Sequence, residues 1–390
     1  MEEALDRIKA LIDGVDDALR EKCIESLQAF IISLEKPDDT LERIVRAPFE
    51  LEGVKIGLNL GIFTYLSSSN SPRDVDALVR ETGADPILLG RLLRYFSSVR
   101  LITEVDKDTF TANNVTKVLA SEKGKNYVDV FYEMVNPTIS KLPEFLERTG
   151  YMNPTDRYNL SLHDAFNWKG DLFSFLKADP RRQALFNRHM QVQRDLITNW
   201  QAMVNILESK QSAEAVLLVD VAGGVGHQCQ RFRAHYPHIE GRIILQDLPE
   251  VIKDALPISG VEAMEHDIFD PQPIQAGAKF YYFRGVLHDF SDQNCKEILH
   301  RTFGAMGLDS AIVVDEMILP DRNVHWKATS VDLQMMANFG SQERTHSHWV
   351  KLIESTGLRV KEVLYHGLDA YQGVIIAVKA DWMEASIAYE

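Results

Sequence analysis

The sequence predicts an α/β fold with a mostly parallel β-sheet, preceded by a long α-helical region. A glycine-rich turn follows the apolar run Leu217–Val221, which is typical of a buried parallel strand that leads into a helix. Later short apolar runs also end in titratable or glycine residues, whereas the first 120 residues have helical periodicity. With 390 residues, 45% of them hydrophobic, the chain can form more than one core. We expect a helical domain over 1–120, a helical cap over 121–210 and a sheet domain over 211–390.

The N-terminal domain is expected to consist of helices followed by a β-hairpin. A helix is predicted over 48–63, and Ser71–Pro72 predicts the start of a short one, with the serine as its cap. Asp85–Pro86 predicts the start of another helix, and two extended runs within 101–111 predict the hairpin. This order of elements is that of a winged helix.

The charge of the chain bears on what this winged-helix-like domain does. Its second helix carries leucines and few cations, and the net charge of the chain is −15. Both argue against binding to nucleic acid or to an anionic membrane. Dimerisation is the expected role, because apolar helices with too little surface to cover them need a partner. We therefore expect a homodimer.

The remaining composition predicts a cytoplasmic protein without a metal. The three cysteines have neither paired nor metal-ligand spacing, which suits a reducing compartment. The N-terminus is acidic, unlike a signal peptide, and no apolar run approaches the length that spans a membrane.

The cap domain is rich in aromatic residues, and polar residues 208–214 mark its end. Most of these aromatic side chains are expected to be ordinary core. One face of the cap is expected to line an apolar substrate cavity, and its residues are Phe166, Trp168, Phe186 and Met190.

A nucleotide-type cofactor site is predicted at the carboxyl ends of the strands. Glycines at 223, 224 and 226 let a ligand approach the backbone, although such a turn alone also fits an ordinary strand–helix corner. The next apolar run, Ile243–Leu245, is followed at Asp247 by a carboxylate suited to a ribose diol. Three later runs end in His266–Phe269, Arg284–Asp289 and Asp315–Glu316. The carboxyl edge of such a sheet is where ligands bind.

Five ordered motifs make the chain resemble the S-adenosylmethionine-dependent O-methyltransferases of the plant caffeate and fungal secondary-metabolite type. The motifs are Val219–Gly226, Asp247–Pro249, Asp267–Phe269, Leu287–Asp292 and Gln342–Thr345. The resemblance implies a Rossmann-like class I methyltransferase domain that binds S-adenosylmethionine, preceded by a winged-helix dimerisation domain. It also implies a small-molecule substrate that carries an aromatic or polyketide-derived hydroxyl.

The resemblance further implies six cofactor-binding residues. They are the turn Gly223 and Gly224 beside the methionine end, the ribose carboxylate Asp247, the adenine-binding pair Asp267 and Ile268, and the basic Arg284 that helps to close the site. Ala222 is a departure, because many relatives have glycine there, and alanine tolerates fewer backbone conformations.

Three further matches imply the catalytic group: His288 as general base, and Glu316 and Glu343 as the carboxylates that orient it. Methyl transfer needs an aligned nucleophile, and a phenol with a pKa of about 10 needs a base to become one. Histidine suits that role near neutral pH. The competing interpretations are a capping or core histidine at His288 and a surface carboxylate at the end of a strand for Glu316.

A second class of function stays open, because pericyclases built on this fold bind the same cofactor and transfer no methyl group. In that case pocket donors would polarise a substrate carbonyl, and Lys327 is the candidate, although a solvated loop lysine is the plainer interpretation. Lys327 precedes an expected pocket helix with Met335, Met336 and Phe339. A non-catalytic regulator is the third class, and the catalytic residues that are present disfavour it.

Overall fold

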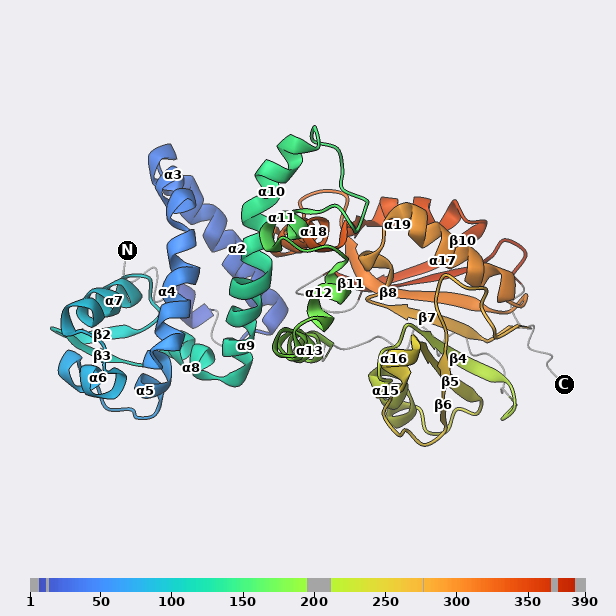
Figure 1. The fold of residues 1–390 in the computed structure, drawn as a ribbon, viewed down its shortest axis with the longest axis horizontal. Coiled ribbons are helices and arrows are strands. Elements are labelled where there is room, and N and C mark those ends of the chain that lie inside the picture. The colour runs from blue at the N-terminus through green and yellow to red at the C-terminus, as the bar shows by residue number, and fades with distance from the viewer. Residues whose placement is uncertain (1–6, 12–13, 195–211, 276, 366–370, 383–390) are drawn as a thin grey trace. The chain divides into compact units, whose positions relative to one another are not determined.

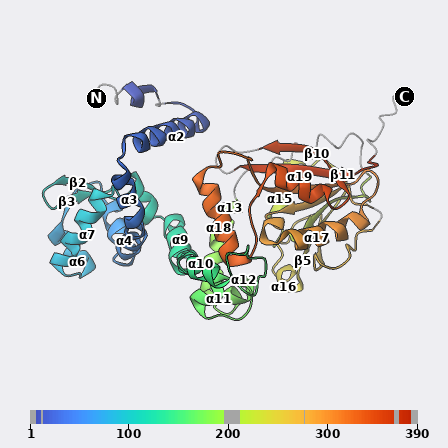
Figure 2. The same ribbon diagram turned by 90° about the horizontal axis from the view of Figure 1, so that it is seen from above.

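The computed structural model describes residues 7–11, 14–194, 212–275, 277–365 and 371–382. The chain forms two compact units (Figures 1 and 2). One, the helical unit, comprises Met1–Gly150 and Ser161–Asp195. The other, the sheet unit, comprises Tyr151–Leu160 and Leu196–Glu390. The expected end of the cap at 210 lies outside the described residues.

The first half of the helical unit contains the winged-helix arrangement. Its elements are α2 (Asp17–Leu34), α3 (Pro37–Arg46), α4 (Pro48–Asn59), α5 (Ile62–Ser67), β1 (Arg73–Asp74), α6 (Val75–Thr82), α7 (Pro86–Ser98), β2 (Thr103–Asp106) and β3 (Thr109–Thr111). The strands pair antiparallel in the order β1-β3-β2. Fully buried Phe63, Phe96 and Phe110 join helices and hairpin in one core.

Two helix boundaries in this half differ from the prediction. The segment 48–63 is not one helix, because Gly61 adopts a left-handed conformation (φ 72°) and separates α4 from α5. The short helix begins at Val75 and not at Ser71, because the Asp74 carboxylate caps it by accepting from Ala77 N. The predicted start of a helix at Asp85–Pro86 is confirmed: α7 begins at Pro86, and the Asp85 carboxylate caps it by accepting from Leu88 N.

The second half of the helical unit consists of helices. They are α8 (Asn114–Ala120), α9 (Glu122–Val130), the π-helical turn η1 (Phe131–Val135), α10 (Asn136–Arg148), α11 (Ser161–Phe166), α12 (Leu172–Lys177) and α13 (Pro180–Arg194). Glu133 of η1 lies 2.7 Å from Arg181 of α13 and 3.5 Å from Lys55 of α4. One carboxylate therefore ties the π-helical turn to two helices.

The sheet unit is built on a mostly parallel sheet with the strand order β10-β11-β8-β7-β4-β5-β6, and β9 pairs with β8. Among the described strands of this sheet, β11 pairs antiparallel with both β10 and β8, and the other pairs are parallel. The strands are β4 (Val216–Val221), β5 (Arg242–Asp247), β6 (Val261–Glu265), β7 (Phe280–Arg284), β8 (Ala311–Leu319), β9 (Arg344–Thr345), β10 (Leu358–Tyr365) and β11 (Gln372–Lys379). The predicted α/β class with a Rossmann-like parallel sheet is thus confirmed.

Helices cover both faces of this sheet. The helical elements of this unit are α15 (His227–His235), α16 (Pro249–Ile252), the 3₁₀ turn η2 (Leu287–Asp289), α17 (Asp292–Ala305), α18 (Trp326–Phe339) and α19 (His346–Glu354). Alternate strand residues point to opposite faces. On one face Val219 and Tyr281 pack with Ile298 of α17 and Trp349 of α19. On the other face residues of the same strands pack with Phe232 of α15.

Strand β8 is longer than the sequence predicted. It continues three residues beyond Glu316 because β11 pairs with it as far as Met317, and β9 pairs with Ile318 and Leu319. Asp315 and Glu316 therefore lie inside the strand and are 2% exposed. Glu316 is not a surface carboxylate at a strand end.

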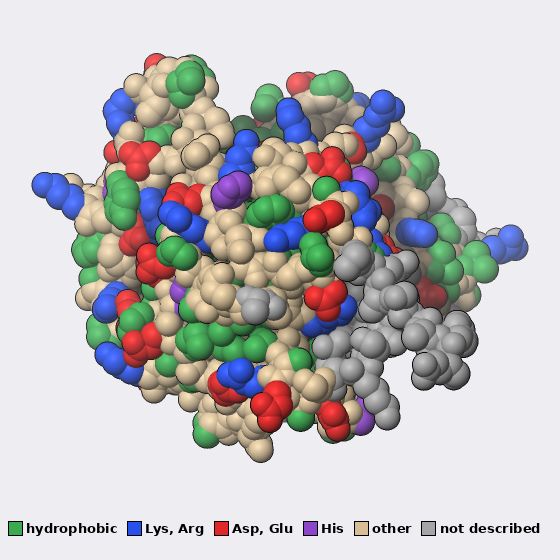
Figure 3. Space-filling model, turned by 90° about the vertical axis from the view of Figure 1, so that its right-hand side faces the viewer, with side chains coloured by type: hydrophobic (Ala, Val, Ile, Leu, Met, Phe, Trp, Pro, Cys, Tyr) green, Lys and Arg blue, Asp and Glu red, His purple; other side chains and the backbone are tan. Residues whose placement is uncertain are grey.

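The surface is mixed in charge on the face shown in Figure 3, where acidic and basic side chains are interspersed. Among the described helices, none is both long and apolar enough to cross a membrane.

Candidate active site

The glycine turn between β4 and α15 has a backbone that glycine favours. Ala222, Gly224 and Gly226 all have positive φ angles, at 54°, 64° and 95°. Ala222, the departure noted in the sequence, thus adopts the left-handed conformation despite its Cβ atom. A Cβ atom at Gly223 would lie 2.5 Å from Asp220 Cγ and 2.7 Å from a Leu245 methyl carbon. Only glycine therefore fits at 223 without displacing these side chains.

The carboxylate of Asp247 connects the end of β5 to this turn. Its Oδ2 accepts from Gly224 N at 2.7 Å, and its Oδ1 accepts from Leu248 N at 2.8 Å. His266 N in turn donates to the Asp247 carbonyl oxygen at 2.9 Å, which ties the end of β6 to the end of β5. Asp267 then accepts from Phe269 N at 3.0 Å. The ends of three adjacent strands therefore meet at one edge of the sheet.

Arg284, at the end of β7, belongs to a buried polar group. Its guanidinium lies 3.4 Å from Asp315 Oδ2, to which the Tyr282 hydroxyl donates at 2.6 Å. Burial opposes the charge of Arg284, but Tyr282 and Asp315 raise its pKa on balance. Ile268 is half-buried and packs against the core cluster that contains Val219.

His288 lies in η2, directly after β7, and Glu343 fixes its ring. The ring nitrogen Nδ1 is 2.9 Å from Glu343 Oε1, and the glutamate side chain is 1% exposed whereas the histidine is 26% exposed. Because an ionised carboxylate can only accept, Nδ1 donates. In the neutral ring Nε2 is therefore the unprotonated nitrogen. It lies 3.6 Å from Asp289 Oδ1.

Glu316 holds the backbone of the same turn and not the ring. Its Oε1 accepts from Val286 N at 2.9 Å and from Leu287 N at 2.8 Å. Its other oxygen is 4.0 Å from His288 Nδ1, too far for a hydrogen bond. The two glutamates that the resemblance assigns to the histidine therefore act differently: one orients the ring and the other fixes the turn that carries it.

The carboxylates around His288 change how the site binds protons. Burial alone would lower the pKa of His288, but Glu316, Glu343 and Asp289 together raise it well above the usual value. Burial raises the pKa of Glu316 to about 7. The imidazole of His288 is thereby made a stronger base than a free histidine.

The expected pocket residues fall in both units. In the helical unit, the ring of Phe166 lies 4.5 Å from that of Phe175 and the ring of Trp168 lies 5.7 Å from it, while Phe186 and Met190 are half-buried on α13. In the sheet unit, α18 packs against η2 and carries the remaining four. They are the buried Met335, the half-buried Met336 and Phe339, and the exposed Lys327 in the first turn.

Sequence reasoning missed a polar group on the other side of η2, formed by Asp292, Arg344 and His348. Arg344 is 0% exposed and donates to Asp292 at 2.9 Å. Asp292 and Arg344 lie in the quoted motifs Leu287–Asp292 and Gln342–Thr345, and this was the only signal that the sequence offered for them. The described residues hold no group of three or more His, Cys, Asp or Glu side chains placed to bind a metal ion.

Comparison with known proteins assigns the class that this sheet and site define. Residues 156–359 match the family model of the O-methyltransferase domain, so the chain belongs to this O-methyltransferase family. The chain is 65% identical over 379 residues to O-methyltransferase ucdC of the fungus Aspergillus ustus. The alignment covers 97% of this chain and 100% of the relative. The predicted membership of the fungal secondary-metabolite type is confirmed.

Two solved structures are similar over nearly the whole chain. One is LepI in complex with S-adenosylmethionine, with 33% identity, a TM-score of 0.86 and coverage of 97% of this chain and 99% of the other. The second, described as a pericyclic reaction enzyme, has 33% identity, the same TM-score of 0.86 and coverage of 97% and 100%. The predicted cofactor, S-adenosylmethionine, is therefore that of this family.

Proposed function

We propose that this protein transfers the methyl group of S-adenosylmethionine to a hydroxyl of a small aromatic or polyketide-derived metabolite, with His288 as the general base. The observation that carries the proposal is the 2.9 Å contact of Nδ1 with buried Glu343, beside an Nε2 that can accept a proton. A carboxylate on one imidazole nitrogen sets the tautomer and stabilises the imidazolium once the other nitrogen is protonated.

The residues of the chain supply the proton transfer. His288 Nε2 takes the hydroxyl proton of the substrate, so that the oxygen becomes a nucleophile for a methyl group. Bound cofactor supplies that methyl group on a sulfonium. Glu343 and Glu316 stabilise the resulting imidazolium by their charge. The products are a methyl ether, S-adenosylhomocysteine and a proton that His288 later releases to solvent.

The turn and strand ends fit the cofactor. We assign Gly223 and Gly224 to its methionine end, because a Cβ atom at Gly223 has no room beside Asp220. Asp247 is assigned to the ribose, since its carboxylate is held at the turn by Gly224 N. The remaining assignments, the adenine-binding pair Asp267 and Ile268 and the closing residue Arg284, follow the family motif. The proposed substrate contacts of the helical unit are Phe166, Trp168, Phe186 and Met190. Those of the sheet unit are Lys327, Met335, Met336 and Phe339 of α18.

We further infer a homodimer formed through the N-terminal helices. Large apolar side chains on α2, α3 and α4 are exposed, among them Phe30 at 59%, Ile44 at 60% and Phe49 at 60%. A second copy of the chain would cover this apolar surface. Light scattering at micromolar concentration should give the mass of two chains, and removal of residues 1–50 should give one chain. A full-length monomer would refute the inference.

A pericyclase is the second candidate, because a pericyclic reaction enzyme is among the similar structures. In that reaction class the site polarises a carbonyl and no methyl group is transferred. Exposed Lys327, at the start of the helix that packs on η2, is the donor in this alternative.

The test incubates the protein with candidate phenols and methyl-labelled cofactor. A labelled product heavier by one methylene, about 14 Da, supports methyl transfer, and an unlabelled isomer or dehydrated product supports the pericyclase. His288→Ala should lower methyl transfer about 10²- to 10⁴-fold at pH 7, with a smaller loss at high pH where solvent removes the phenol proton. Near-normal methylation by that variant at pH 7 would refute the mechanism. In a pericyclase, Lys327→Ala would be more damaging than His288→Ala.

A further inference from the structure

Arg344 lies behind the turn that carries His288 and binds both of its ends. The side chain is completely buried, and its two terminal nitrogens donate to Leu287 O at 3.1 Å and to Phe290 O at 2.8 Å. These carbonyls belong to the residues that flank His288 and Asp289 in the chain. One rigid, planar guanidinium therefore fixes the distance across the turn.

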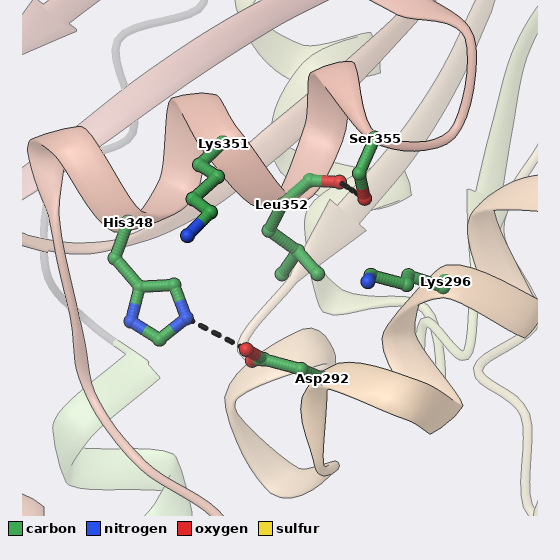
Figure 4. A pocket seen from close by; sticks show the side chains of 6 residues that line it. All are labelled: Asp292, Lys296, His348, Lys351, Leu352 and Ser355. Atoms are coloured by element: carbon green, nitrogen blue, oxygen red, sulfur yellow. Dashed lines mark hydrogen bonds and ion pairs between the residues drawn. The ribbon is translucent and has the colours of Figure 1, made fainter.

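Arg344 is held in place by a chain of charged groups that reaches the surface. Its Nε donates to Asp292 Oδ1 at 2.9 Å, and its guanidinium lies over the ring of Trp349. His348 points toward Asp292, and its Nε2 is 2.7 Å from Asp292 Oδ2, as Figure 4 shows. Burial would raise the pKa of Asp292, but the hydrogen bonds from His348 and Arg344 lower it on balance. The carboxylate that holds Arg344 therefore stays ionised.

The surface end of this chain of groups borders a cavity of about 260 Å³ between α17 and α19 (Figure 4). Asp292, Lys296, His348 and Lys351 contribute polar side chains to its lining. His348 and Asp292 thus contact solvent while Arg344 does not. Substitutions at Asp292 can loosen Arg344 without opening the core.

Glu343 and Arg344 are consecutive, and they hold the same turn in two ways. Glu343 contacts the imidazole ring, whereas Arg344 contacts the backbone carbonyls on either side of it. The pairing of Arg344 with Ile318 in β9 and β8 fixes the backbone from which both extend. The peptide N–H of Glu343 also donates to Asp332 of α18 at 2.8 Å. A shift of the turn therefore changes the distance between ring and carboxylate.

We propose that Arg344, held by Asp292 and His348, is a positioning residue that keeps the His288 ring against Glu343. The proposal rests on the proposed function only in taking His288 as the base. The charged groups facing His288 are Glu343, Glu316 of β8 and its neighbour Asp289. All are carboxylates, and they stabilise the protonated ring. Releasing the turn moves the ring away from them and lowers its affinity for a proton.

The experiment measures the protonation of His288 directly, by NMR titration of protein labelled in its histidine rings. His288→Asn identifies the His288 signal. In Arg344→Met that signal should titrate at least about one pH unit lower than in the wild type, and in Asp292→Asn it should move in the same direction by less. Arg301→Met is the matched control, because Arg301 forms an exposed pair with Glu297 on α17 and should leave the titration unchanged.

An unchanged His288 titration in folded Arg344→Met would overturn the proposal. If Arg344→Met does not fold, as judged by circular dichroism, Asp292→Asn decides, and its unchanged titration overturns the proposal equally. In a methyl-transfer assay with a substrate that the wild type methylates, Arg344→Met should lower kcat at least about tenfold. The KM for the cofactor should stay constant. The two proposals can fail separately. If the His288 titration shifts in Arg344→Met but the wild type transfers no methyl group, the positioning role is supported and the proposed function is refuted.

Discussion

Replacing Glu343 by glutamine tests the role of the carboxylate that contacts His288. Glu343→Gln preserves the shape of the side chain and leaves a carbonyl oxygen as an acceptor for Nδ1, so it removes only the charge. Glu343 is 5% exposed, and its Oε1 lies 2.9 Å from the ring. Water therefore cannot replace the lost charge at the same position.

The size of the effect follows from the strength of such a contact. A hydrogen bond to a charged group contributes about 1.5–3 kcal/mol, and one pKa unit corresponds to about 1.4 kcal/mol. The pKa of His288 should therefore fall by about 1–2 units in Glu343→Gln. The same loss of imidazolium stabilisation should lower the plateau value of kcat about 10- to 150-fold.

The assay is a pH–rate profile of methyl transfer between about pH 5 and pH 10. His288 must be neutral to accept a proton, and its pKa is raised in the folded protein, so the wild-type rate falls as the pH drops through that raised value. In Glu343→Gln this acid limb should lie at lower pH. Glu262→Gln, which removes an exposed carboxylate paired with Arg242, is the control. An acid limb that stays in place or moves to higher pH would refute the reasoning.

Three further substitutions test the remaining site. Asp247→Ala removes the expected ribose acceptor and should weaken cofactor binding about 10- to 150-fold by calorimetry; an unchanged dissociation constant would remove Asp247 from the site. Gly223→Ala places a Cβ atom 2.5 Å from Asp220 Cγ and should abolish cofactor binding or lower stability by about 1–3 kcal/mol, whereas wild-type behaviour would show that the turn has room. Glu316→Leu leaves two buried N–H groups without an acceptor. It should lower the free energy of unfolding by about 2–6 kcal/mol. A denaturant titration should show a much smaller loss for Glu316→Gln.

The sheet and the position of the cofactor turn could be predicted from the sequence because both depend on local pattern. Apolar β-branched runs followed by glycine or carboxylate residues specify buried parallel strands and their ligand edge. The same reasoning placed Asp247 and the glycine turn at one edge of the sheet, and in the structure Gly224 N donates to the Asp247 carboxylate. Ala222 was recognised as a departure, and its positive φ of 54° is a conformation that glycine adopts more readily than alanine.

The resemblance implied that Glu343 orients His288, but the other contacts around the histidine could not be predicted, because they join residues that are distant in the chain. The motif grouped Glu316 and Glu343 as equivalents, but β8 runs three residues past Glu316 and turns its carboxylate to the backbone of η2. The length of β8 depends on pairing with β9 and β11, which no local pattern encodes. Arg344 was missed for the same reason, since its partners lie 49 to 57 residues earlier.

The electrostatics of the site bear on both candidate reactions through the protonation state of His288. Buried carboxylates are costly, and the cost is visible in Glu316, whose pKa burial raises to about 7. Placing Glu316, Glu343 and Asp289 around one imidazole raises its affinity for a proton. Methyl transfer to a phenol uses the neutral ring as the proton acceptor, and proton transfer becomes easier as the pKa of the imidazolium approaches the phenol value of about 10. A pericyclic reaction would use the protonated ring as a donor that polarises a carbonyl. The two reactions therefore need opposite protonation states of His288, and the pH–rate profile distinguishes them: the rate rises with pH through the raised pKa of His288 for methyl transfer and falls for the pericyclic reaction.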